Sequence, residues 1–373
     1  MGTDESAAVV IASPKEIKKQ EVKHLKTPNP VRAVYMTSCV AGTPSLRNRL
    51  VKLVEETELN SVVIDIKDYS GNIAFQSDTP LLKDALGITC KVGDMKEFIE
   101  SLHEKGIYVI GRITVFQDPF FAKKRPDLAV QKESDKTVWK DYKKISFIDG
   151  GALEYWDYVI TLSKESYEIG FDELNFDYVR FPSDGNMRDI YYPLSESRII
   201  ADPHFGKAQI LKEFFAYLHL ALKDPTVYKN NPPVLSVDLF GMTTTNTDDL
   251  NIGQVIEFAE PYFDYIAPMV YPSHYPKGFN GYQNVNAYPY EIVKFSMDRG
   301  VLRLLAASST PSKIRPWLQD FNYPVPYTAD MVRAQIQAVY DAGLDSWMLW
   351  SSSNQYTRAA LQPDIELGNV LTE

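Results

Sequence analysis

The sequence has few of the residues that build metal centres and no pattern that spans a membrane. It contains two cysteines and five histidines in 373 residues. Cys39 and Cys90 show no metal-ligand spacing, and free cysteines are usually buried, so we expect two free, fairly buried thiols. No run approaches the roughly 20 apolar residues that cross a bilayer. We therefore expect no metal, no cofactor and no membrane span.

Basic residues and phosphate-binding loops are also scarce. The chain has 39 Lys and Arg against 49 Asp and Glu, a net charge of −10. Such a balance repels a phosphate backbone, so nucleic acid is not an expected partner. Thr37-Ser38-Cys39-Val40-Ala41-Gly42 stands after the first predicted strand, where G-x-G-x-x-G would mark a dinucleotide site, and no P-loop or G-x-S-x-G elbow occurs. These absences disfavour an open doubly wound sheet.

The composition is otherwise that of a folded chain. Hydrophobic residues make up 45%, including 23 Tyr and five Trp, too many for a wholly disordered protein. Residues 1–30 carry several lysines without sustained periodicity, so we expect an N-terminal arm, followed by one domain over residues 31–373. Because Met1-Gly2-Thr3-Asp4 fits a start from which an export signal is absent, we expect an extracytoplasmic or secreted protein, with a cytoplasmic one as the alternative.

Short runs typical of β-strands recur along the chain, with helical patterns between them. In the clearest helical pattern, Met95, Phe98, Ile99 and Leu102 share one face. Strands and helices that alternate without a break in composition indicate one parallel sheet of the α/β class, and eight units close a (β/α)₈ TIM barrel. The eight predicted strands are Val31–Ser38, Ser61–Ile66, Ile107–Thr114, Phe171–Asp177, Val234–Leu239, Tyr265–Val270, Val301–Ala307 and Asp345–Trp350.

Carboxylates stand at the ends of the fourth and fifth predicted strands. The period of two puts Glu173, Asn175 and Asp177 on one face, and Asp238 ends the next strand. Neighbouring strands lie about 4.8 Å apart. Two such carboxyl groups can approach the separation of roughly 5–5.5 Å that retaining glycosidases use. We expect Asp177 to be nucleophile or base and Asp238 to be acid, or the reverse.

Other charged residues end the second, third and fourth strands, and they fit a role in setting the ionisation of this pair. The same period places Asp65 and Lys67 on one face. A purely structural alternative makes Asp177 an ion-pair partner of a nearby arginine and Asp238 a hydrogen-bonded core carboxylate. The charged residues predicted to contact substrate are Asp65, Lys67, Arg112 and Arg180.

Aromatic residues follow the sixth and eighth strands. Tyr271, His274 and Trp350 are predicted to shape a sugar subsite, because flat apolar rings suit the C–H faces of sugars; the alternative is that the rings fill the barrel wall. The loop Ala306–Pro311 lacks the glycines of a barrel phosphate site, which disfavours a phosphorylated substrate. Long excursions on the C-terminal face are predicted at Gln117–Gly150, Ser183–Gly206 and Pro272–Tyr288.

These motifs resemble the DUF4015 family of inferred glycoside hydrolases, from about Val31 to Tyr356. The resemblance implies a (β/α)₈ barrel that acts on glycans. A more distant likeness is to chitinase-like barrels, but Val179 occupies the position of their proton-donating Glu, so their substrate-assisted chemistry is not expected. The DUF4015 likeness rests on Val63-Ile64-Asp65-Ile66-Lys67-Asp68, Arg112-Ile113-Thr114-Val115-Phe116-Gln117-Asp118-Pro119, Asn175-Phe176-Asp177-Tyr178-Val179-Arg180-Phe181-Pro182, Pro268-Met269-Val270-Tyr271-Pro272-Ser273-His274-Tyr275 and Trp350.

The sequence thus predicts a glycoside hydrolase that cleaves a polysaccharide or cell-envelope glycan with a carboxylate pair. One alternative is a barrel that binds carbohydrate without cleaving it. Another is lyase or aldolase chemistry through a Schiff base on Lys67. The oligomeric state is left open.

Overall fold

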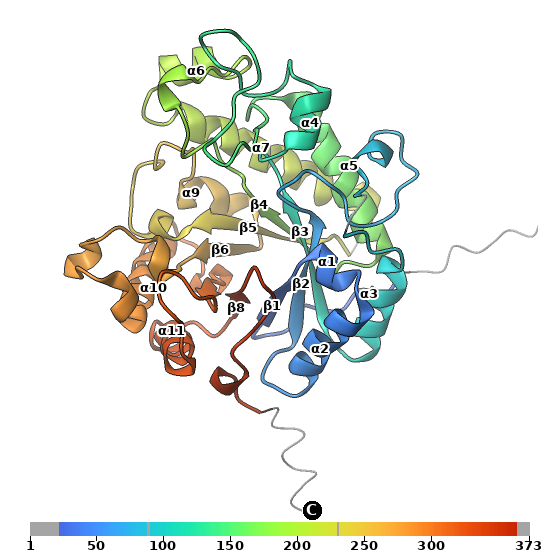
Figure 1. The fold of residues 1–373 in the computed structure, drawn as a ribbon, viewed down its shortest axis with the longest axis vertical. Coiled ribbons are helices and arrows are strands. Elements are labelled where there is room, and N and C mark those ends of the chain that lie inside the picture. Colours follow the sequence, from blue (N-terminus) through green and yellow to red (C-terminus); the bar gives the residue numbers. More distant parts are fainter. Residues whose placement is uncertain (1–21, 88–89, 230, 364–373) are drawn as a thin grey trace, which may run out of the picture.

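The computed structural model describes residues 22–87, 90–229 and 231–363. Its parallel strands form a closed eight-stranded barrel in sequence order, with the last strand paired to the first (Figure 1). The predicted (β/α)₈ TIM barrel of the α/β class is confirmed. The strands are β1 (Arg32–Met36), β2 (Ser61–Lys67), β3 (Tyr108–Thr114), β4 (Glu173–Asp177), β5 (Val234–Phe240), β6 (Tyr265–Met269), β7 (Trp317–Gln319) and β8 (Trp347–Trp350).

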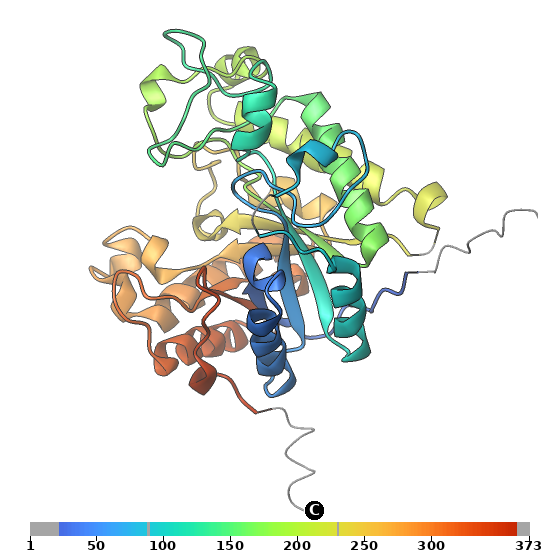
Figure 2. The ribbon, with the colours of Figure 1, turned by 45° about the vertical axis from the view of Figure 1, so that its right-hand side comes forward.

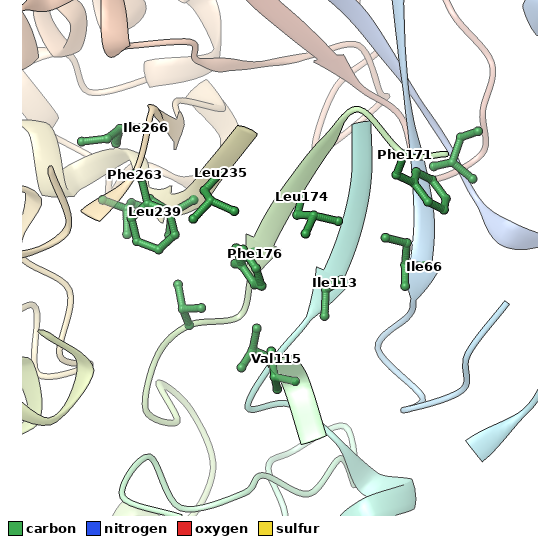
Figure 3. Close-up of a cluster of buried hydrophobic side chains, with 14 of the residues drawn as sticks. Ile66, Ile113, Val115, Phe171, Leu174, Phe176, Leu235, Leu239, Phe263 and Ile266 are labelled. Carbon is green, nitrogen blue, oxygen red and sulfur yellow. The ribbon is translucent and has the colours of Figure 1, made fainter. Parts of the chain in front are cut away.

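Helices surround the barrel and are separated from it by a continuous apolar layer. Alternate strand residues such as Ile113, Leu174 and Phe176 point outward into this layer (Figure 3). Among the described residues, no helix is long and apolar enough to cross a membrane. The helices are α1 (Ser38–Ala41), α2 (Pro44–Glu55), α3 (Met95–Glu104), α4 (Pro119–Lys124), α5 (Leu153–Ile169), α6 (Glu196–Ala201), α7 (Gly206–Leu222), α8 (Pro225–Tyr228), α9 (Ile256–Ala259), α10 (Pro289–Ala306) and α11 (Ala329–Asp341).

The excursions after β3 and β4 gather on one side of the barrel, where α4 and α6 lie in the upper part of both views (Figures 1 and 2). A segment of the first is held to one of the second by backbone hydrogen bonds between Gln131 and Tyr191 in both directions, at 3.0 and 2.8 Å. Asp149 also links the two excursions, because its carboxylate accepts hydrogen bonds from the amides of Leu194 and Ser195. The two excursions therefore form one wall beside the strand ends.

Residues 22–30 close the opposite end of the barrel. The Leu25 amide donates to Asp172 Oδ1 at 2.7 Å, and Thr27 Oγ1 lies 3.0 Å from the Tyr108 hydroxyl. The ring of His24 stacks on Tyr167 with centroids 3.9 Å apart. Asp172 is buried and also contacts His103 Nε2 at 2.9 Å. Residues 22–30 therefore cover the end of the barrel that lies opposite the long excursions.

The prediction of a seventh strand at Val301–Ala307 is wrong. Those residues continue α10 to Ala306, and the strand is the three-residue β7. Gly300 does not end the helix; a Cβ there would lie 3.2 Å from Ile314 Cδ1, so the glycine allows close packing. The pattern within Val301–Ala307 is helical, since Leu304 is buried while Leu302 and Leu305 are exposed. The loop Ala306–Pro311 therefore precedes β7, and its lack of glycines does not bear on whether the substrate is phosphorylated.

The expectation of two free, buried thiols is also wrong. Cys39 and Cys90 form a disulfide with their Cα atoms 3.9 Å apart, and Cys39 is exposed. Cys39 lies in α1, after β1, and Cys90 lies in the connection from β2 to α3. Connections that leave the same end of adjacent strands meet in space, which brings together two residues separated by 51 positions.

Reduction of this disulfide is expected to lower the free energy of unfolding by about 2–4 kcal/mol, because the cross-link restricts a long loop of the unfolded chain. Thermal unfolding with and without a reductant measures the loss. The Cys39→Ser/Cys90→Ser variant should unfold at the lower temperature under both conditions. The prediction would be contradicted if a reductant did not lower the unfolding temperature of the wild type.

Candidate active site

A cavity of about 420 Å³ opens at the C-terminal ends of the strands. This is the end where (β/α)₈ barrels place their sites. Of the predicted site residues, Asp65 and Lys67 do not line the cavity. Those that do are Arg112, Asp177, Arg180, Asp238, Tyr271, His274 and Trp350.

Arg112 of β3 joins two carboxylates at the floor of this cavity. Its Nε and Nη2 donate to Asp177 Oδ2 at 3.0 and 2.6 Å, and its Nη1 donates to Asp65 Oδ1 at 2.7 Å. The Tyr35 hydroxyl donates to the other Asp65 oxygen at 2.5 Å. Burial opposes the charge of Arg112, but Asp177 and then Asp65 raise its pKa well above the usual value. Asp65 therefore lies behind the site and supports Arg112.

Asp177 ends β4 and has both oxygens engaged. Oδ2 accepts the two Arg112 bonds, and Oδ1 accepts from the Tyr178 amide at 2.5 Å. Tyr178 has φ = 52°, a left-handed conformation that is uncommon for a bulky residue and persists only where the surrounding structure holds the backbone in place. Among the described residues Asp177 pairs with Arg112 and not with Arg180.

Asp238 of β5 is buried beside Asp177 in a different environment. Pairing of Phe176 with Val237 puts the two aspartates level on neighbouring strands. Asn175 Nδ2 and Trp317 Nε1 both donate to Asp238 Oδ1, at 2.9 and 2.8 Å. Within the described chain no hydrogen bond reaches Oδ2. Burial, and then the charge of Asp177, raise the pKa of Asp238 well above its usual value.

The prediction that Asp65 and Lys67 share a face is wrong. The register of β2 against β3 shifts between them, so that Asp65 pairs with Arg112 but Lys67 pairs with the next residue, Ile113. A shift of one residue sends a side chain to the opposite face. Lys67 is fully buried outside the barrel, where its Nζ lies 2.9 Å from Asp118 Oδ2 and donates to the Thr114 carbonyl at 2.6 Å.

A lysine sealed in this way cannot reach a substrate carbonyl, so borohydride with any sugar is expected to trap no adduct on Lys67. Lys67→Met should lower the free energy of unfolding by about 3–5 kcal/mol, because it leaves the buried Asp118 carboxylate unpaired. In Lys67→Met/Asp118→Asn the loss should be smaller than in the single variant. Chemical denaturation compares the three proteins. A borohydride adduct on Lys67 would contradict the assignment.

Aromatic rings form one wall of the cavity. Trp350 stacks on Tyr35 with centroids 4.0 Å apart and meets Trp317 edge to face at 5.5 Å. Tyr271, which follows β6, is also buried, and its ring meets His274 edge to face at 5.3 Å. His274 is exposed and lies at the rim of the cavity. No group of three or more potential ligands among the described His, Cys, Asp and Glu could hold a metal ion.

Sequence reasoning missed three residues that organise the carboxylates. Trp317 was missed because the seventh strand was misplaced, although Pro316-Trp317-Leu318-Gln319 reads as a short strand that begins after a proline. Asn175 was placed on the correct face, but no sequence signal shows that its amide reaches Asp238. Tyr35 lies on the inward face of β1, where an aromatic residue alone does not predict a hydrogen bond to Asp65.

Comparisons with known proteins agree with this barrel. The family model DUF4015, described as "Putative glycosyl hydrolase domain", matches residues 33–356. No curated protein matches the chain.

Several solved glycosidases share the fold at low identity. α-L-Fucosidase isoenzyme 2 from Paenibacillus thiaminolyticus aligns with a TM-score of 0.56 and 13% identity over 89% of this chain and 47% of its own. An α-galactosidase from Thermus thermophilus aligns with a TM-score of 0.51 and 13% identity over 94% of this chain and 62% of its own. The α-amylase AmyB from Thermotoga neapolitana aligns with a TM-score of 0.51 and 12% identity over 91% of this chain and 70% of its own. This chain thus spans about half of the fucosidase. Because the family match covers residues 33–356, most of the chain, the chain belongs to the family DUF4015.

Proposed function

We propose that the chain hydrolyses glycosidic bonds of a polysaccharide or cell-envelope glycan with Asp177 and Asp238. The supporting observation is that two carboxylates in the same cavity have unequal surroundings. Two guanidinium N–H groups donate to Asp177, which suits an ionised carboxylate, whereas burial favours the protonated form of Asp238. A pair of acids held in different protonation states is what glycoside hydrolysis requires.

In this proposal Asp238 is the acid. Asn175 and Trp317 hold its Oδ1, so the proton resides on Oδ2, which is free to donate to the departing glycosidic oxygen. Asp177 acts at the anomeric carbon as nucleophile, or as the base that activates water. Its negative charge stabilises the oxocarbenium-like transition state in either case.

The aromatic wall supports a sugar as the substrate. Tyr271, Trp317 and Trp350 line the cavity with apolar faces, next to carboxylate and guanidinium groups that can bind hydroxyls. A cavity with apolar walls and a few convergent polar groups is typical of a small-ligand site.

Hydrolysis of a panel of polysaccharides and cell-wall glycans tests the proposal. The wild type, Asp177→Asn and Asp238→Asn would be compared, with Asp78→Asn as the matched control, because Asp78 is exposed and lies outside the cavity. Product release that is lost in the first two variants, but kept in the control, supports the proposal. Glycan binding by the wild type without product release would replace it with the non-catalytic carbohydrate-binding barrel.

A further inference from the structure

Arg180 is a buried cation in the wall of the cavity. Its exposed fraction is 9%, and no described residue forms an ion pair with it. One N–H is used, since Nη1 donates to the Phe181 carbonyl at 3.0 Å. Arg112, in the same cavity, is engaged by Asp65 and Asp177. Burial lowers the pKa of Arg180, so the fold bears a desolvation cost that no carboxylate at contact distance offsets.

Three aromatic rings fix the orientation of this guanidinium. Its central carbon lies 5.1 Å from the ring centroid of Tyr178, 5.2 Å from that of Phe240 and 5.5 Å from that of Phe147. Rings stabilise a cation without neutralising its charge. The remaining N–H groups are therefore held in place and available to a ligand, as a preorganised binding group requires.

Lysines extend the positive charge from Arg180 into a second cleft. Lys143 lines the cavity, and Lys140 and Lys144 of the same loop line a neighbouring cleft of about 400 Å³ with Lys132. The segment that follows β4 also reaches both clefts, since Ser183 lines the first and Asn186 lines the second. No ion pair with a described residue involves Lys140, Lys143 or Lys144. A basic path thus leads away from the barrel axis in a protein whose net charge is −10.

We propose that the glycan is an acidic polysaccharide containing uronic acids, with one sugar carboxylate bound by Arg180 and further carboxylates held along the lysine cleft. This inference rests on the proposed function and names its substrate class. A planar guanidinium matches a carboxylate bidentately. The carboxylates of Asp177, Asp184 and Asp238 line the same cavity and disfavour a dianion such as a phosphate ester. In the second cleft, Asp189 is already engaged by the Ser134 amide and hydroxyl.

Calorimetric binding of polygalacturonate, alginate and hyaluronan oligosaccharides tests the proposal, each beside its carboxyl-reduced counterpart. Asp238→Asn protein would be used as well as the wild type, so that turnover does not affect the titration. We expect at least one acidic oligosaccharide to bind about 10–100-fold more tightly than its reduced form, as a charged hydrogen-bonded pair allows. Hydrolysis by the wild type is measured separately, so failure of catalysis and failure of acid recognition are distinguishable.

Substitutions then locate the recognition. Arg180→Gln and Arg180→Met should abolish the preference for the acidic form without lowering thermal stability, because each removes a desolvated charge. Lys140→Gln/Lys144→Gln should weaken the binding of longer acidic oligosaccharides more than the binding of short ones. The matched control is Arg188→Gln, an exposed arginine outside both clefts that should change nothing. Equal binding of acidic and reduced glycans, no binding of either, or a preference for sulfated over carboxylated glycans would each overturn the proposal. So would a preference that survives Arg180→Gln.

Discussion

Asp238→Asn is expected to abolish hydrolysis and to make the protein more stable. Loss of a general acid lowers the rate by about 10²–10⁴-fold. The amide keeps an oxygen for the two hydrogen bonds from Asn175 and Trp317, and it removes a carboxyl group whose ionisation burial opposes. We expect a gain of about 0.5–2 kcal/mol at neutral pH, the range of stabilising changes at strained functional positions.

The gain in stability of Asp238→Asn over the wild type should depend on pH. Because the folded-state pKa of Asp238 is raised, the native protein binds more protons than the unfolded chain between the unfolded value of about 3.9 and the folded value, so wild-type stability falls as pH rises through that window. Asp238→Asn lacks this fall, and the two stability curves should converge at low pH and separate above it. Wild-type activity should decline as pH rises through the same folded-state pKa.

Denaturation across pH measures the effect, and Asp238→Ala is its control. The alanine variant also removes the charge, but it leaves the Trp317 N–H and one of the two Asn175 N–H groups without an acceptor, so it should not gain stability. Equal stability of Asp238→Asn and wild type at every pH would show that Asp238 is already solvated or ionised in the folded protein.

Arg112→Met should lower the free energy of unfolding by about 3–5 kcal/mol and leave no measurable hydrolysis. Its side chain is the cation shared by Asp65 and Asp177, and its removal leaves two buried carboxylates without a counter-charge. The expected result is a lower denaturation midpoint with an unchanged denaturant slope.

The triple variant Asp65→Asn/Arg112→Met/Asp177→Asn separates the effect of unpaired buried charge from the effect of lost packing of the arginine side chain. It should recover much of the stability, because no buried charge is left unpaired, while it stays inactive. A triple variant no more stable than Arg112→Met would mean that the loss comes from packing of the arginine stem against Tyr35 and Trp350, over whose rings the guanidinium lies at 5.5 and 5.0 Å.

Regular strands were predictable from the sequence, and irregular ones were not. In β4 the period of two holds throughout, so the inward direction of Glu173, Asn175 and Asp177 follows from alternation alone. In β2 one register shift next to Lys67 breaks the same rule. Such a shift depends on how β2 pairs with β3, which no local pattern of residues expresses.

Short elements and long-range contacts limited the rest of the prediction. With three residues, β7 is too short for a periodic signal, and the apolar end of α10 mimics a strand beside it. The disulfide joins residues that only the barrel topology brings together. The environment of Asp238 also depends on two other strands, β4 and β7, so its protonation could not be derived from β5.

Trp350, in the aromatic wall of the cavity, is backed by a ring from the other end of the folded sequence. Tyr35 belongs to β1 and Trp350 to β8, and their strands pair through Arg32 and Trp347. Contacts between segments so far apart are non-local, so this seam depends on the intervening units that bring β1 and β8 together. The carboxylates of Asp65, Asp177 and Asp238 come from β2, β4 and β5. Trp350 therefore keeps its stacking partner only in a closed barrel, and Asp238 likewise needs β7 for the hydrogen bond from Trp317.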